Sequence, residues 1–268
     1  MSFDLFVSYR HLDADRVRPV VEAMRGQGLS VWFDESVIED FAPITDAIRS
    51  GLAQSKALLA WYSVTYPQSR PCQMELTAAY IAAGQANETA RRVLVVNPEA
   101  DSKHILPEPL RDNLYLPGDM APVELSRRIA SHLSTLTGCL GAIPPITAPS
   151  QYGARFTGSS RFVGRLIELW DLHGRLHQGE HAIISGRVSR PGLAQVAGMG
   201  GQGKSLLAEE YALRFGAAYP GGIFWLRALG QDISGSGPGL EQDHVMRDSA
   251  FRDIAQRLAI SVQGKTLA

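Results

Sequence analysis

Residues 198–205 have the types and the spacing that bind phosphate. They read GMGGQGKS and fit the pattern G-x-x-x-x-G-K-[ST]. Glycines without Cβ atoms let backbone N–H groups surround phosphate oxygens, Lys204 would reach the β and γ phosphates, and the Ser205 hydroxyl would ligate Mg²⁺. The glycines concerned are Gly198, Gly200, Gly201 and Gly203. The pattern predicts a site for ATP or ADP with Mg²⁺; the alternative is a glycine-rich turn that binds nothing.

The elements around this loop favour the first interpretation. An apolar strand is expected at 193–196 and an amphipathic helix at 205–215, whose N-terminus would attract the anion. A further strand is expected at 222–226, and helices at 162–176 and 251–262, with a glycine-rich loop over 230–239. Residues 161–268 are therefore predicted to be the first part of a P-loop NTPase domain of the α/β class.

The first 137 residues also alternate strand and helix patterns. Apolar runs predict strands at 5–7, 29–33, 57–62 and 93–96, and periodic apolar positions predict helices at 13–27, 43–55, 72–83 and 123–136. Buried strands separated by helices indicate a mostly parallel, doubly wound sheet. Glycine, proline, serine and threonine then gather over residues 138–160, which we interpret as a linker.

Composition excludes several classes of protein. The chain is 45% hydrophobic and 20% charged with a formal net charge of −1, which argues against a dedicated nucleic-acid binder. No run approaches the roughly 18 apolar residues of a membrane span, and residues 1–10 do not resemble a secretory signal. The two cysteines, Cys72 and Cys139, fit a reducing compartment. We expect a cytoplasmic protein that binds neither nucleic acid nor membrane.

Three segments of the first part resemble TIR domains. Residues 4–10 (DLFVSYR) resemble their first box, 28–34 (GLSVWFD) their second strand and the start of the BB loop, and 63–76 the stretch leading into a main helix. The resemblance implies a flavodoxin-like TIR domain over residues 1–137. It also implies NAD⁺ glycohydrolase activity, because many TIR domains cleave the nicotinamide–ribose bond with a glutamate that corresponds to Glu75. Loss of neutral nicotinamide leaves an oxocarbenium-like ribosyl centre that one carboxylate can stabilise.

Other side chains are expected to line the same crevice at the carboxyl ends of the strands. The expected substrate-binding residues are Ser8, Tyr9, Arg10, Phe33, Asp34 and Cys72. Arg10 would pair with the dinucleotide phosphates, or is an exposed loop arginine, and Phe33 is equally compatible with a core position. Cys72 reads more simply as a small buried residue than as a nucleophile. The alternative for Glu75 is a solvated or capping glutamate near the helix start.

Two departures from the family bear on the site. Bacterial members commonly carry Trp-Cys where this chain has Pro71-Cys72, and the BB loop over residues 35–42 lacks the usual glycine.

The second part resembles the NB-ARC branch of the STAND NTPases. The segment 162–165 (FVGR) with Glu168 upstream of the phosphate loop carries this resemblance, and it implies that Val163 and Arg165 lie near the adenine. The chain ends before an acidic Walker B strand, a sensor arginine or a winged helix. We therefore expect a C-terminally truncated form of a bacterial TIR-NLR-like protein, in which ATP hydrolysis is not expected.

The leading hypothesis is an NAD⁺ glycohydrolase that self-association of TIR domains switches on, in antiphage defence. Two other functions remain open: a non-enzymatic TIR adaptor that acts by assembly, and an ATP- or ADP-dependent switch.

Overall fold

The computed structural model describes most of the first part of the chain and a smaller share of the second. The described ranges are 2–33, 46–112, 115–143, 162, 164–177, 192, 194–219 and 222–224, with residues 249, 252, 255 and 256. Asp34, the BB-loop residues 35–42, Val163, most of the linker and the glycine-rich loop over 230–239 lie outside these ranges.

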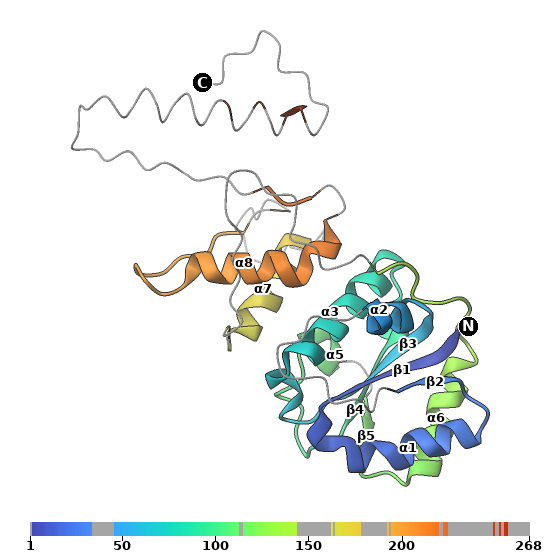
Figure 1. Ribbon diagram of the computed structural model, residues 1–268. Coiled ribbons are helices and arrows are strands. Elements are labelled where there is room, and N and C mark those ends of the chain that lie inside the picture. The colour runs from blue at the N-terminus through green and yellow to red at the C-terminus, as the bar shows by residue number, and fades with distance from the viewer. Residues whose placement is uncertain are drawn as a thin grey trace, which may run out of the picture.

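A five-stranded parallel sheet forms the centre of the first part, as Figure 1 shows. Its strands are β1 (Phe3–Tyr9), β2 (Val31–Trp32), β3 (Ser55–Trp61), β4 (Val93–Asn97) and β5 (Leu116–Pro117), in the order β2-β1-β3-β4-β5. This is the flavodoxin-like order, so the predicted fold of the first part is confirmed. β1 and β3 are buried over most of their length, as expected for central strands of a sheet covered on both faces.

Helices cover both faces of the sheet (Figure 1). α1 (Ala14–Gly26) and α6 (Pro122–Leu133) share one apolar cluster with Leu5 and Val7. α2 (Asp46–Ala53) and α3 (Arg70–Gln85) share the other with Phe6. The split follows from the two-residue period of a strand, which sends Leu5 and Val7 to one side and Phe6 to the other.

Five short elements of this part were not predicted from the sequence. They are α4 (Thr89–Arg92), α5 (Glu108–Asp112), β5 and the 3₁₀ turns η1 (His11–Asp13) and η2 (Tyr66–Gln68). β5 is two residues long and ends in a proline, so it presents no alternation to recognise. Its pairing with β4, through Val96 and Leu116, is a tertiary effect.

The second part contains two long helices among its described residues. These are α7 (Leu166–His177) and α8 (Lys204–Phe215), which agree with the predicted helices. The strands predicted at 193–196 and 222–226 were wrong for the positions described, since 194–196 and 222–224 have no strand structure. A strand needs a neighbour for its N–H and C=O groups, and the described residues give neither segment such a neighbour.

The packed body of the first part continues beyond residue 137. The N–H of Leu140 donates to the Ser55 carbonyl at 2.8 Å and that of Gly141 to the Ala53 carbonyl at 3.2 Å. Leu140 and Ile143 join the cluster of α2 and α3. No helix among the described residues is long and apolar enough to cross a membrane.

Candidate active site

The carboxyl end of β1 carries three of the residues singled out in the sequence. Ser8 and Tyr9 close the strand and Arg10 follows it. β1 lies between β2 and β3. The chain therefore passes from β1 to β2 on one side and then crosses over to β3 on the other side of β1. Ligands of open α/β sheets bind at this kind of switch point.

α3 brings Glu75 to the same edge. Ser69 is the N-cap of the helix and its hydroxyl accepts from the Cys72 N–H at 3.5 Å, with Pro71 in the first turn. This accounts for where the helix begins, because serine at the N-cap and proline just inside are both favoured there. Glu75 lies in the second turn and is not a cap, so the capping interpretation was wrong.

The Glu75 carboxylate belongs to a buried chain of hydrogen bonds. The Ser8 hydroxyl donates to Glu75 Oε2 at 2.6 Å, and the hydroxyls of Ser8 and Tyr66 lie 2.7 Å apart. The Tyr66 hydroxyl also donates to the Cys72 carbonyl at 3.2 Å. Glu75 is only 6% exposed. The carboxylate is therefore aimed at the end of β1 but is covered in this conformation.

Tyr66 was not singled out from the sequence. It lies in a single 3₁₀ turn, Tyr66–Gln68, before α3 and is fully buried. Burial, reinforced by the nearby Cys72 and Glu75, raises the pKa of its hydroxyl well above the ordinary value, so it stays a neutral hydrogen-bonding group. A Tyr-Pro pair ahead of a helix carries no signal of this contact with a strand 58 positions away.

Cys72 is buried against β1. Its Sγ donates to the Tyr9 carbonyl at 3.3 Å. Burial first, and the Glu75 carboxylate second, raise the pKa of the thiol. A nucleophile needs the thiolate, so these surroundings favour the small buried residue over the nucleophile.

Arg10 and Phe33 flank this arrangement at the end of the sheet. Arg10 is half-buried, and its Nη1 donates to the Thr65 carbonyl at 3.1 Å and to Gln68 Oε1 at 3.3 Å. Phe33 stacks on Tyr9, with ring centroids 4.8 Å apart. Of the expected residues, Ser8 and Cys72 therefore lie beside Glu75, and Arg10 follows at the same end of β1. The rings of Tyr9 and Phe33 pack together against the cluster on the other face of the sheet.

Comparison with known families agrees with this architecture. Residues 5–133 match the family model described as TIR domain. This part of the chain is a TIR domain. No curated protein matches the sequence.

Solved structures similar to the chain include two TIR proteins. One is a metazoan TIR-STING receptor from C. gigas in complex with 2',3'-cGAMP, with 22% identity over 51% of this chain and a TM-score of 0.40. The other contains the TIR domains of the activated Roq1 resistosome directly recognizing the pathogen effector XopQ, with 18% identity over 52% of this chain and a TM-score of 0.34. The match covers 41% of the first protein and 87% of the second.

The glycine-rich loop lies outside the TIR domain, in front of α8. Gly201 and Gly203 have φ angles of 77° and 75°, a region that other residues rarely adopt. The Lys204 ammonium folds back and donates to the carbonyls of Gly198 and Met199, at 2.8 and 2.7 Å. A Cβ added at Gly200, Gly201 or Gly203 would meet nothing within 4 Å. The loop thus presents open backbone beside a lysine.

Two other residues that were predicted to bind the nucleotide are exposed to solvent. Ser205 is exposed in the first turn of α8, and Arg165 is exposed just before α7. Among the described residues, no group of three or more His, Cys, Asp or Glu side chains could hold a metal ion.

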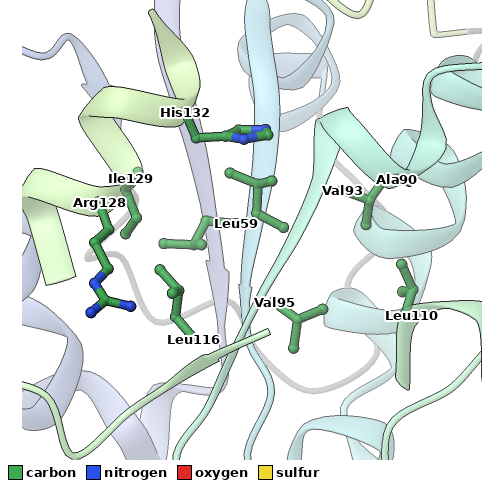
Figure 2. A pocket seen from close by; sticks show the side chains of 10 residues that line it. Leu59, Ala90, Val93, Val95, Leu110, Leu116, Arg128, Ile129 and His132 are labelled. Carbon is green, nitrogen blue, oxygen red and sulfur yellow. The ribbon is translucent and has the colours of Figure 1, made fainter. Parts of the chain in front are cut away.

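A separate cavity of about 400 Å³ lies at the β4 and β5 side of the TIR domain. Its walls are mainly aliphatic, including Leu59, Val95 and Leu116, and α6 contributes Arg128 and His132 (Figure 2). None of its lining residues belongs to the Glu75 arrangement, and none is an acid. It offers no carboxylate to stabilise a cationic centre.

Proposed function

We propose that the TIR domain cleaves the nicotinamide–ribose bond of NAD⁺, with Glu75 as the catalytic carboxylate. The observation that carries the proposal is the 2.6 Å hydrogen bond from Ser8 to Glu75. It sets a carboxylate at the carboxyl end of β1, beside the switch point at which ligands bind in sheets of this order. Arg10, at the same edge, is a cation suited to the dinucleotide phosphates.

The chemistry needs one ionised carboxylate and no proton donor for the leaving group. The bond between ribose C1′ and the nicotinamide nitrogen breaks, and its electron pair stays on that nitrogen, which becomes neutral. The positive charge left on the ribose is stabilised by the Glu75 carboxylate. Water then adds to C1′ and loses a proton, so NAD⁺ and water give ADP-ribose, nicotinamide and a proton. Attack by a group of the ADP-ribose itself would give a cyclised product.

Access to Glu75 requires a change of conformation, because the side chain is 6% exposed. We propose that self-association of TIR domains supplies this change and completes the site. A role in antiviral defence follows from the resemblance to bacterial TIR-NLR-like proteins.

Nicotinamide release from NAD⁺ tests the proposal directly. The purified chain is assayed dilute, under crowding and after induced oligomerisation, alongside Glu75→Gln and the control Glu22→Gln, which changes an exposed glutamate of α1. We expect release that rises on assembly, is lost in Glu75→Gln and is kept in Glu22→Gln. Release that persists in Glu75→Gln, or is absent under every condition, contradicts the proposal.

The burial of Glu75 favours a second candidate, a TIR adaptor that works by assembly alone. In that case the carboxylate stabilises the fold through Ser8 and never meets a substrate. Assembly without nicotinamide release, unaltered in Glu75→Gln, would support the adaptor.

We also propose that residues 198–205 bind the phosphates of ATP or ADP. The support is the motif together with the position of Lys204. Its ammonium donates to two backbone carbonyls of the loop, and phosphate oxygens would take the place of these acceptors. A nucleotide that copurifies with the chain, is kept in Lys103→Ala and is lost in Lys204→Ala would agree with this. Equal retention by both variants would contradict it.

A further inference from the structure

α3, the helix that carries Glu75, is covered on more than one side. Residues Cys72–Thr77 are all buried, whereas a helix with a solvent face exposes a residue in almost every turn. Cys72 and Leu76 belong to the cluster over the sheet. α7 and α8, from the second part of the chain, pack nearby and add Leu169, Leu207 and Phe215 to the same cluster (Figure 1).

An ion cluster joins the first residue of α3 to α8. Arg70 Nη2 lies 3.3 Å from Oε1 and 3.4 Å from Oε2 of Glu210, and Arg214 Nε donates to Glu210 Oε1 at 2.7 Å. The Glu210 side chain is 0% exposed and that of Arg214 is 7% exposed. A buried carboxylate needs such partners, because loss of one leaves charge poorly compensated in a low dielectric.

Aromatic contacts extend the interface away from this cluster. Trp170 of α7 packs edge-on against Tyr80 of α3, with centroids 5.1 Å apart, and against Phe215 of α8 at 4.9 Å. The Trp170 Nε1 is buried and has no hydrogen-bond partner in the described part of the chain. An interface with an unpaired polar atom is weaker than its apolar area suggests, which suits a contact that is made and released.

Residues 65–72 comprise the end of the loop before α3 and the first residues of that helix. Two of them, Tyr66 and Cys72, are buried and lie close enough to the Glu75 carboxylate that it adds to burial in raising their pKa values. We call residues 65–72 the cover. β1 fastens it at several points: Ser8 contacts Tyr66, Arg10 donates to Thr65 and Gln68, and the Tyr9 carbonyl accepts from Cys72. Arg70, in the same segment, is held from outside the TIR domain by Glu210. To expose Glu75 the cover must leave β1, and the bond to Glu210 opposes that movement.

We propose that the contact between Arg70 and Glu210 is an intramolecular latch that keeps the cover closed over Glu75. The inference rests on the proposed role of Glu75 as the catalytic carboxylate. The second part of the chain then represses the TIR domain by holding its cover in place.

Cys72 provides a probe of opening that does not depend on catalysis. It is 4% exposed and lies at the end of the cover, whereas Cys139 is exposed. In a Cys139→Ser background, the rate at which a thiol reagent labels Cys72 in the native protein reports how often the cover opens. Arg70→Gln removes the latch but leaves Glu210 paired with Arg214, so the fold is expected to survive. Arg91→Gln is the control, because it breaks an exposed pair with Glu88 beyond the other end of α3.

We expect Arg70→Gln to label at least about tenfold faster than the parent, and Arg91→Gln to label at the parent rate. Glu210→Gln is not a matched partner for Arg70→Gln, because it also weakens the buried pair with Arg214. Amide exchange in β3 must stay at the parent rate, which separates opening of the cover from global unfolding. Parent-rate labelling in Arg70→Gln overturns the latch. Faster labelling without any nicotinamide release supports the latch and contradicts the proposed catalysis.

Discussion

The Ser8 hydroxyl donates a 2.6 Å hydrogen bond to Glu75 Oε2, joining residues 67 positions apart. One partner lies near the end of β1 and the other in the second turn of α3. Since β1 is an interior strand, paired with β2 on one side and β3 on the other, the carboxylate takes its position from a rigid element. Sites held in this way keep their geometry better than sites on loops.

Ser8→Ala is expected to reduce nicotinamide release by about 10- to 100-fold, because a hydrogen bond to a charged group contributes roughly 1.5–3 kcal/mol. Initial rates at saturating NAD⁺ measure the effect, under the assembly condition that activates the parent. Ser134→Ala, at the exposed end of α6, serves as the control and should keep the parent rate. A folded Ser8→Ala variant with the parent rate would show that this bond does not position Glu75.

Tyr66→Phe should have a smaller effect on the same rate, since the hydrogen bonds that link Tyr66 to the Glu75 carboxylate run through Ser8. In the double variant with Ser8→Ala, the loss should match that of Ser8→Ala alone, because the two residues act in series. Additive losses would mean that Tyr66 acts on the carboxylate by another route.

Much of the TIR fold was predictable because its strands and helices carry strong local patterns. The run Leu5–Val7 predicted a strand, and the pattern over 72–83 predicted the helix of Glu75. The rule that ligands bind at carboxyl ends of parallel strands pointed to Tyr9 and Arg10, whereas Glu75 was assigned to the site by the resemblance to TIR domains. The predicted elements agree with the structure because they depend on short-range periodicity.

Contacts between segments that are far apart in the chain could not be predicted from local sequence patterns. Nothing local to Tyr66 indicates its bond to Ser8, and the contact of Arg70 with Glu210 joins residues 140 positions apart. The burial of Glu75 could not be predicted from the sequence either, since it depends on the cover and not on the helix pattern. The predicted strand at 193–196 shows the opposite error, in which an apolar run was read as a strand although the described residues supply no neighbour to pair with it.

The two cysteines are expected to differ sharply in reactivity. In the native chain at pH 8, a thiol reagent should modify Cys139 quickly and Cys72 much more slowly, because Cys72 is buried and its raised thiol pKa leaves little thiolate. Cys139→Ser should remove the fast phase and leave the slow one. Two fast thiols in the native chain would contradict the buried position of Cys72.

Gly51→Ala is expected to destabilise the TIR domain by about 1–3 kcal/mol. A Cβ at Gly51 would clash with the indole ring of Trp32, and the indole cannot yield easily because it stacks on Phe6 with centroids 4.3 Å apart. Gly84→Ala is the matched control, since its nearest neighbour would be 3.5 Å away and alanine favours a helix by roughly 0.5–1 kcal/mol. Urea denaturation should therefore move in opposite directions for the two variants, and equal shifts would argue against the Trp32 clash.

Acid should weaken the packing of α7 on α8 through His173. This side chain is 8% exposed, stacks on Phe215 at 4.4 Å, and its Nδ1 lies 3.0 Å from the Tyr211 hydroxyl. Burial, and to a lesser extent the neighbouring His177, lower the pKa of His173 from 6.5 to about 4. The unfolded chain therefore binds a proton at His173 more readily than the folded chain does.

The sign of the effect follows from this difference. Stability from the neutral His173 is complete above pH 6.5 and is lost as the pH falls from 6.5 to about 4, by an amount on the order of 3 kcal/mol. Melting temperatures over this range should fall less steeply for His173→Gln than for the parent, whereas His11→Gln, at an exposed position, should follow the parent. The same slope in His173→Gln and the parent would mean that other groups cause the acid sensitivity. A flatter slope would identify the packing around His173 as an acid-sensitive part of the second region.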